Sequence, residues 1–195
     1  MGFPDIKYGI FLVALLMGIT LLLGFVIASD DIRVAEGFRD QYTSSLSTRI
    51  LLTYATDTQV YFLMIFFGNL FLDCMLFFPV RFLKDRWTII APVFIVSVIG
   101  YNGLLIGSLG YLGTMRWGLP LTLAALLPHG VIELTAMVIA AALGITYALR
   151  SMQESGHCRE FGSYARVFLT VVTPMVAIAA LIEVYVTHIV IYSMA

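Results

Sequence analysis

The chain has 195 residues, of which 61% are hydrophobic and only 12% are charged, and its net charge is -1. Soluble domains are close to half apolar and a quarter charged, so no water-soluble fold of this length could bury so much apolar surface. This composition excludes a soluble enzyme, a secreted disulfide scaffold and a nucleic-acid-binding protein. We therefore expect an all-α protein, a polytopic helical bundle whose solvent is the lipid bilayer.

The N-terminal part of the chain changes from apolar to polar near residue 29. A membrane-crossing helix needs about 20 apolar residues, and the stretch 8–28 meets this length. It is longer than the apolar core of a signal peptide, so we expect a retained anchor helix. In the polar segment 29–57, apolar residues recur mostly at steps of four after Phe38. This spacing predicts an amphipathic helix along the membrane interface, and a solvated linker is the alternative.

Four further apolar regions predict the remaining spans. They cover residues 58–78, 87–112, 119–149 and 164–194. The region 119–149 is too long for one straight crossing, and Pro128 and Gly130 lie within it. Because proline removes an amide donor and clashes with the preceding turn, we expect this fourth element to kink or break near Pro128. Residues 1–195 then form a single membrane domain of about five spans.

The distribution of positive charge predicts the orientation of these spans. Lysine and arginine in short loops favour the cytoplasmic side of a membrane. If the N-terminus is cytoplasmic, seven of these residues face the cytoplasm and four face outward. The seven are Lys7, Arg81, Lys84, Arg86, Arg150, Arg159 and Arg166, and the four are Arg33, Arg39, Arg49 and Arg116. We therefore expect a multi-pass protein of the cell membrane with a cytoplasmic N-terminus, an outer C-terminus and the 29–57 segment outside.

Several polar side chains interrupt the predicted spans at similar depths. They are Asn69, Asp73, Asn102, His129, Glu133 and Glu183, with His188 closer to the outer surface. Ionisable groups in a bilayer are costly and usually face the interior of the bundle. A rise of about 1.5 Å per residue places Asn69, Glu133 and Glu183 near the midplane. His129 and Glu133 are four residues apart and share a helix face. We therefore expect an intramembrane polar cluster.

Three interpretations of this cluster remain open. The polar groups could satisfy one another and hold the helices in register. Alternatively, Glu133, Glu183 and His129 could line a path for a proton, an ion or a lipid headgroup. In the third interpretation the same three residues bind a zinc-like metal for hydrolysis. Neither the HExxH sequence nor a serine or cysteine nucleophile motif is present, which favours a non-enzymatic role.

Glycines at helical spacing mark the predicted third span. Gly103, Gly107 and Gly110 form a stripe of small residues suited to close helix packing. If such a face is exposed, it could also support a homodimer.

Four segments resemble the stage II sporulation protein M family of integral membrane proteins. They are LPHGVIELTAMVIAAALGITYALR (127–150), FFGNLFLD (66–73), IGYNGLLIG (99–107) and AALIEVYVT (179–187). The resemblance covers about residues 61–188. Two positions depart from the family pattern: Leu70 follows Asn69 where a second asparagine is common, and His188 follows Thr187 where proline is frequent.

The resemblance implies a compact helical bundle of about five spans. The bacterial sporulation member works with peptidoglycan-degrading partners during engulfment, and it organises a complex without being the hydrolase. We therefore expect a scaffold or assembly factor of the cell envelope, with the lipid bilayer and envelope proteins as partners and no cofactor. A small transporter or lipid-handling protein is the alternative, and a metal-dependent membrane hydrolase is the third possibility. The resemblance highlights the same residues as the depth argument: Asn69, Asn102, His129, Glu133 and Glu183.

Overall fold

The computed structural model describes residues 4–44, 58–82, 89–153 and 161–187, and every element in these ranges is helical. Five helical segments of this part are long and apolar enough to cross a membrane, which confirms the predicted all-α fold. The first four are α1 (Pro4–Asp30), α4 (Thr58–Phe77) with the 3₁₀ turn η1 (Phe78–Phe82), α5 (Ile90–Trp117) and α6 (Leu119–Gln153). The fifth, which we call the C-terminal run, consists of α7 (Phe161–Val167), η3 (Phe168–Val172), α8 (Thr173–Ile182) and η4 (Glu183–Thr187). A sixth helix, α2 (Ile32–Ser44), follows α1.

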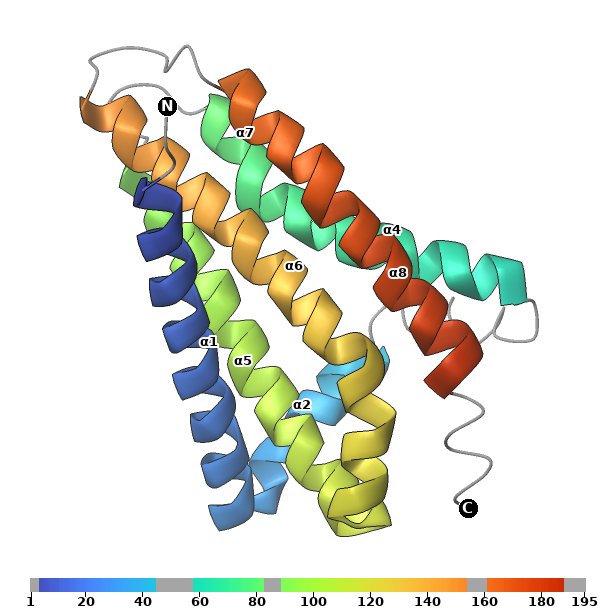
Figure 1. Cartoon of the computed structure of the whole chain (residues 1–195). Coiled ribbons are helices and arrows are strands. Elements are labelled where there is room, and N and C mark those ends of the chain that lie inside the picture. The colour runs from blue at the N-terminus through green and yellow to red at the C-terminus, as the bar shows by residue number, and fades with distance from the viewer. Residues whose placement is uncertain (1–3, 45–57, 83–88, 154–160, 188–195) are drawn as a thin grey trace.

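Of the kink or break expected at Pro128 and Gly130, the structure shows a kink. α6 runs from Leu119 to Gln153 without interruption, and Pro128 lies inside it. Figure 1 shows that α6 instead changes direction in its N-terminal half. Proline removes one amide donor, whereas a complete break would leave several backbone groups unpaired in an apolar medium. A bend therefore relieves the clash with the proline ring at lower cost than a break.

α6 is the central helix of the bundle, because it contacts α1, α4, α5 and α8. Figure 1 shows α1 and α5 on one side of it, and α4 with α7 and α8 on the other. Its C-terminal half is rich in alanine, and Ala136, Ala140, Ala141 and Ala148 are fully buried. Gly144 faces the backbone carbonyl of Leu76 in α4. Small side chains thus let the neighbouring helices approach α6 closely.

α1 and α5 pack against each other through glycine. A Cβ atom on Gly107 would meet the carbonyl oxygen of Leu21, and one on Gly103 would meet the Thr20 side chain. This confirms the predicted packing role of Gly103 and Gly107. Gly110 differs, because nothing lies within 4 Å of the position of its Cβ. Because Gly103 and Gly107 are covered by α1, they are not free to contact a second copy of the chain. The homodimer stays a prediction.

The turn between α1 and α2 is stabilised by Asp31. The backbone amide of Arg33 donates to the Asp31 carboxylate at 3.0 Å, which is the hydrogen bond of an N-cap residue. The Arg33 guanidinium also pairs with this carboxylate at 2.8 Å. Hydrogen bonds from Arg33 hold the pKa of Asp31 below its ordinary value. The sequence Asp31–Arg33 thus ends α1 and starts α2.

α2 packs its apolar face against α5. Ala35 is fully buried, and the ring of Phe38 meets the ring of Tyr101 edge-on, with 6.1 Å between centroids. The helix predicted within 29–57 is therefore present over residues 32–44, and it crosses the bundle next to α5 (Figure 1). Residues 45–57 of that segment lie outside the described residues, as do residues 188–194 of the predicted fifth span.

Aromatic rings fasten α4 to the C-terminal run at one end of the bundle. Phe77 is fully buried and stacks on Phe161 and Phe168, with centroid distances of 5.3 and 5.4 Å. Tyr147 of α6 meets Phe161 edge-on at 5.2 Å. Because α4, α6 and the C-terminal run are joined here, the polar residues further along these helices face one another.

Candidate functional site

Three ionisable side chains of the predicted cluster converge between α6 and η4. His129 and Glu133 come from α6 and Glu183 from η4, and one potential ligand atom of each lies within 4.8 Å of the other two. Their four-residue spacing places His129 and Glu133 on the same face of α6. We call these three residues the His–Glu–Glu cluster. All three are half-buried, so they lie at the edge of the protein interior.

A threonine holds the histidine of this cluster. The Oγ1 atom of Thr187 lies 3.1 Å from Nδ1 of His129, and Thr187 is buried. Thr187 and Glu183 are the last and first residues of η4, a π-helical turn. Such turns occur frequently at functional sites. The sequence argument did not select Thr187, although its position four residues after Glu183 was a usable signal.

A further carboxyl group lies next to the cluster. Asp73 of α4 is only 3% exposed, and it interacts electrostatically with Glu133, which in turn interacts with Glu183. In the described part of the chain, no lysine or arginine forms an ion pair with any of these three carboxyl groups. Three acidic side chains from α4, α6 and η4 therefore adjoin without a lysine or arginine partner there.

The two asparagines of the predicted cluster have less central positions. Asn102 donates to the carbonyl oxygen of Val98 at 2.9 Å, so its amide is used within α5. Asn69 is half-buried on α4, one helical turn before Asp73. His188 lies outside the described residues. The structure thus joins His129, Glu133 and Glu183, with Asp73 beside them.

The donor set of the cluster suits a cation. Imidazole nitrogen and carboxylate oxygen are common zinc ligands, and three protein ligands leave a fourth position open. Tetrahedral zinc with bonds of about 2.0–2.2 Å spaces its ligand atoms by roughly 3.4 Å. Since the ligand atoms lie within 4.8 Å of one another, small side-chain movements would bring them to this spacing. The same groups could also accept and pass on a proton.

Comparison with known proteins identifies a family. The profile of the family described as stage II sporulation protein M matches residues 10–188. This range includes every residue of the His–Glu–Glu cluster, Asp73 and Thr187. No curated protein and no solved structure gives a significant match.

Proposed function

Because the chain belongs to the stage II sporulation protein M family, we propose that it is a non-enzymatic assembly factor of the cell envelope. We also propose that a divalent cation at the His–Glu–Glu cluster fixes the C-terminal run against α6. The observation that carries this proposal is the convergence of three potential ligands from two separate elements. A cation held by both elements would join them, as structural metals do in other folds. In this proposal the N-terminus is cytoplasmic and the C-terminus is outside.

The charges around the cluster support a bound cation. Two carboxylates that adjoin in a medium of low dielectric constant repel each other strongly. No lysine or arginine of the described residues forms an ion pair with either carboxylate. A divalent cation between Glu133 and Glu183 would supply the missing positive charge and would also bind His129.

The hydrogen bond between His129 and Thr187 supports the same role for the histidine. Metal-binding histidines usually use the second ring nitrogen for a hydrogen bond that orients the ring. In His129 the Nδ1 atom meets Thr187 Oγ1, which leaves Nε2 for a cation. Thr187 is thus a positioning residue for the proposed ligand.

Metal analysis of the purified full chain tests the cation. The protein is purified without a polyhistidine tag, loaded with zinc, passed through a desalting column and measured by inductively coupled plasma mass spectrometry. We expect one zinc per chain in the wild type and in the control Glu36→Gln, which changes a carboxylate of α2. We expect Glu133→Gln and Glu183→Gln to lose most of this zinc on the desalting column, because each removes a proposed ligand. Folded variants that keep full metal content would overturn the cation site.

The assembly role has a separate test. Metal-loaded protein in liposomes is incubated with lipid and peptidoglycan fragments, and the products are followed by mass spectrometry. We expect no turnover above that of Glu133→Gln. Metal-dependent hydrolysis of either substrate would replace the assembly role with an enzymatic one.

The orientation can be tested in intact cells. A cysteine replaces exposed Ser29 at the end of α1, in a chain whose Cys74 and Cys158 are changed to alanine. We expect a membrane-impermeant maleimide to label Ser29→Cys from outside the cell. Labelling only after the cells are opened would reverse the proposed orientation.

Proton or cation transport is a second candidate, and a specific observation favours it. Glu183, Glu133 and Asp73 form a row of carboxyl groups that crosses from η4 through α6 to α4. Rows of this kind serve as proton relays in pumps and transporters. If the protein transports protons or cations, proteoliposomes should show a flux that Asp73→Asn abolishes. If the cation is a fixed structural one, there should be no flux, and the metal content of Asp73→Asn should equal that of the wild type.

A further inference from the structure

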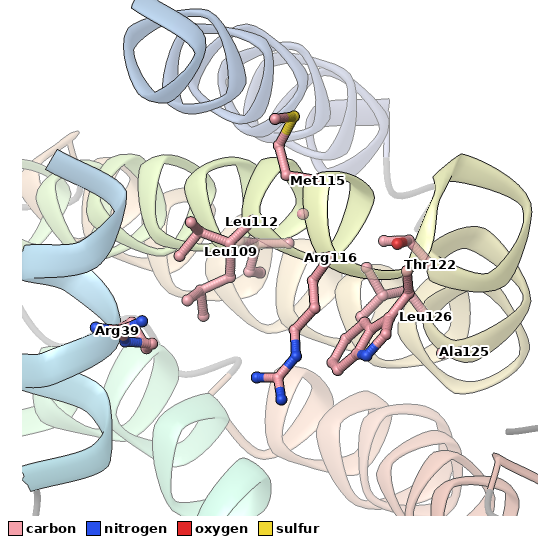
Figure 2. Close-up of a pocket in the computed structure, with 12 residues that line it drawn as sticks. Arg39, Leu109, Leu112, Met115, Arg116, Thr122, Ala125 and Leu126 are labelled. Carbon is pink, nitrogen blue, oxygen red and sulfur yellow. The ribbon is translucent and has the colours of Figure 1, made fainter. Parts of the chain in front are cut away.

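A groove with a volume of about 550 Å³ lies between α2, α5 and α6, and it shares no residue with the His–Glu–Glu cluster. Figure 2 shows its lining, which is mostly apolar. The apolar walls come from Ile106, Leu109, Leu112 and Met115 of α5 and from Ala125 and Leu126 of α6. Gly110 also lines the groove, and nothing lies within 4 Å of where its Cβ would be. The groove thus has room along one side of α5.

This apolar groove has a positive rim at the end formed by Arg116. Arg116 of α5 lies at this end, whereas Arg39 of α2 lines the opposite end, beyond Leu109 (Figure 2). Arg39 forms an ion pair with the neighbouring Asp40 carboxylate at 2.9 Å. Arg116 forms no ion pair among the described residues, and its guanidinium lies 5.6 Å from the ring centre of Trp117. The rim therefore carries a net positive charge.

The position of these residues matches the two parts of a lipid. Arg116 and Trp117 are the last residues of α5, and both residue types are favoured at the headgroup level of a membrane. Guanidinium groups bind phosphate oxygens through two parallel hydrogen bonds. The leucines and Gly110 continue from this rim along α5 toward the membrane interior, where an acyl chain would lie.

We propose that this groove binds one phospholipid with an anionic headgroup. The phosphate contacts Arg116, and an acyl chain covers Leu112 and Leu109 in the direction of Arg39. Charge complementarity between the rim and the headgroup selects an anionic lipid over a zwitterionic one. This site is independent of the proposed cation and of the assembly role.

Native mass spectrometry of the full chain tests the site. The protein is exchanged from detergent into mixed micelles that contain phosphatidylglycerol and phosphatidylcholine with identical acyl chains. We expect one retained phosphatidylglycerol, preferred over phosphatidylcholine by about tenfold, the size of one or two charged hydrogen bonds. Arg116→Gln should abolish the preference. Gly110→Leu should prevent retention of either lipid, because its side chain fills the groove.

Matched variants separate the groove from the rest of the lipid-facing surface. Gly68→Leu adds the same side chain at an open position of α4, and Arg33→Gln removes an exposed arginine of α2 outside the groove. Both should retain phosphatidylglycerol like the wild type. Equal retention of the two lipids, or unchanged retention in Arg116→Gln, would overturn the proposal. So would saturable binding of inorganic phosphate that competes with the lipid at millimolar concentration, because the site would then recognise a free anion.

Discussion

The packing of α1 on α5 predicts opposite effects for the same substitution at two glycines of one helix. Gly107 lies against the α1 backbone, where a Cβ would meet the carbonyl oxygen of Leu21 and lie 2.9 Å from the amide nitrogen of Phe25. Gly110 lies less than one turn further along α5, with nothing within 4 Å of its Cβ position. Gly107→Ala should therefore destabilise the fold, whereas Gly110→Ala should not.

The magnitudes follow from the atoms that the new methyl group meets. At Gly107 these atoms belong to the backbone of α1, so the helices must separate by about 1 Å, because packed interiors leave no spare room. Overpacking of this kind costs about 1–3 kcal/mol. At Gly110 the methyl group is accommodated, and the higher helix propensity of alanine favours it by up to about 1 kcal/mol. Since the propensity gain applies at both glycines and cancels in the comparison, we expect the two free energies of unfolding to differ by about 1–3 kcal/mol.

Reversible unfolding in mixed micelles measures this difference. The denaturing detergent is titrated, and the fluorescence of Trp87 and Trp117 follows the transition for the wild type and both variants. The midpoint should fall for Gly107→Ala and stay or rise for Gly110→Ala. Equal midpoints for the two variants would refute the close approach of α1 to α5.

Three further substitutions test other parts of the structure. Ser108→Ala removes the hydroxyl that donates to the carbonyl oxygen of Gly24 at 3.1 Å. In the same titration the free energy of unfolding should fall by about 0.6 kcal/mol, with an upper bound of about 1.7 kcal/mol. Phe77→Ala should cost about 3–5 kcal/mol because this ring is fully buried between two other rings, and a loss below about 1 kcal/mol would contradict the aromatic packing. Pro128→Ala should straighten α6 and lengthen the distance between spin labels at its two ends, and an unchanged distance would mean that proline is not the cause of the bend.

The number of crossings and the outline of the cluster could be predicted because both depend on local sequence. A span requires only a run of about 20 apolar residues, and five such runs are present. His129 and Glu133 share a face through their spacing alone. The depth of Glu183 in the membrane, estimated by counting residues along its span, also predicts that it lies near them. The packing of Gly103 and Gly107 was also visible as a stripe on one helix.

The remaining features depend on contacts between segments far apart in the chain. The spacing of Thr187 and Glu183 is local, but the contact of Thr187 with His129 joins residues 58 positions apart and follows only from the fold. The amphipathic spacing of α2 is the same whether its apolar face meets lipid or α5. Arg39 and Arg116 counted only as charges that set orientation until the fold brought them to one groove. The sequence left open whether the helix kinks or breaks near Pro128, and the cost of unpaired backbone groups in lipid accounts for the kink.

The most direct test of the proposed function measures whether a cation fixes the C-terminal run against α6. Spin labels replace the exposed residues Leu149 of α6 and Tyr185 of η4 in a chain without native cysteines. Their distance distribution is recorded by double electron–electron resonance with zinc and after chelation. We predict one narrow distribution with zinc, a broad one without it, and no response to zinc in the Glu183→Gln variant. A distribution that is equally narrow in the presence and absence of zinc would contradict the proposed role of the cation.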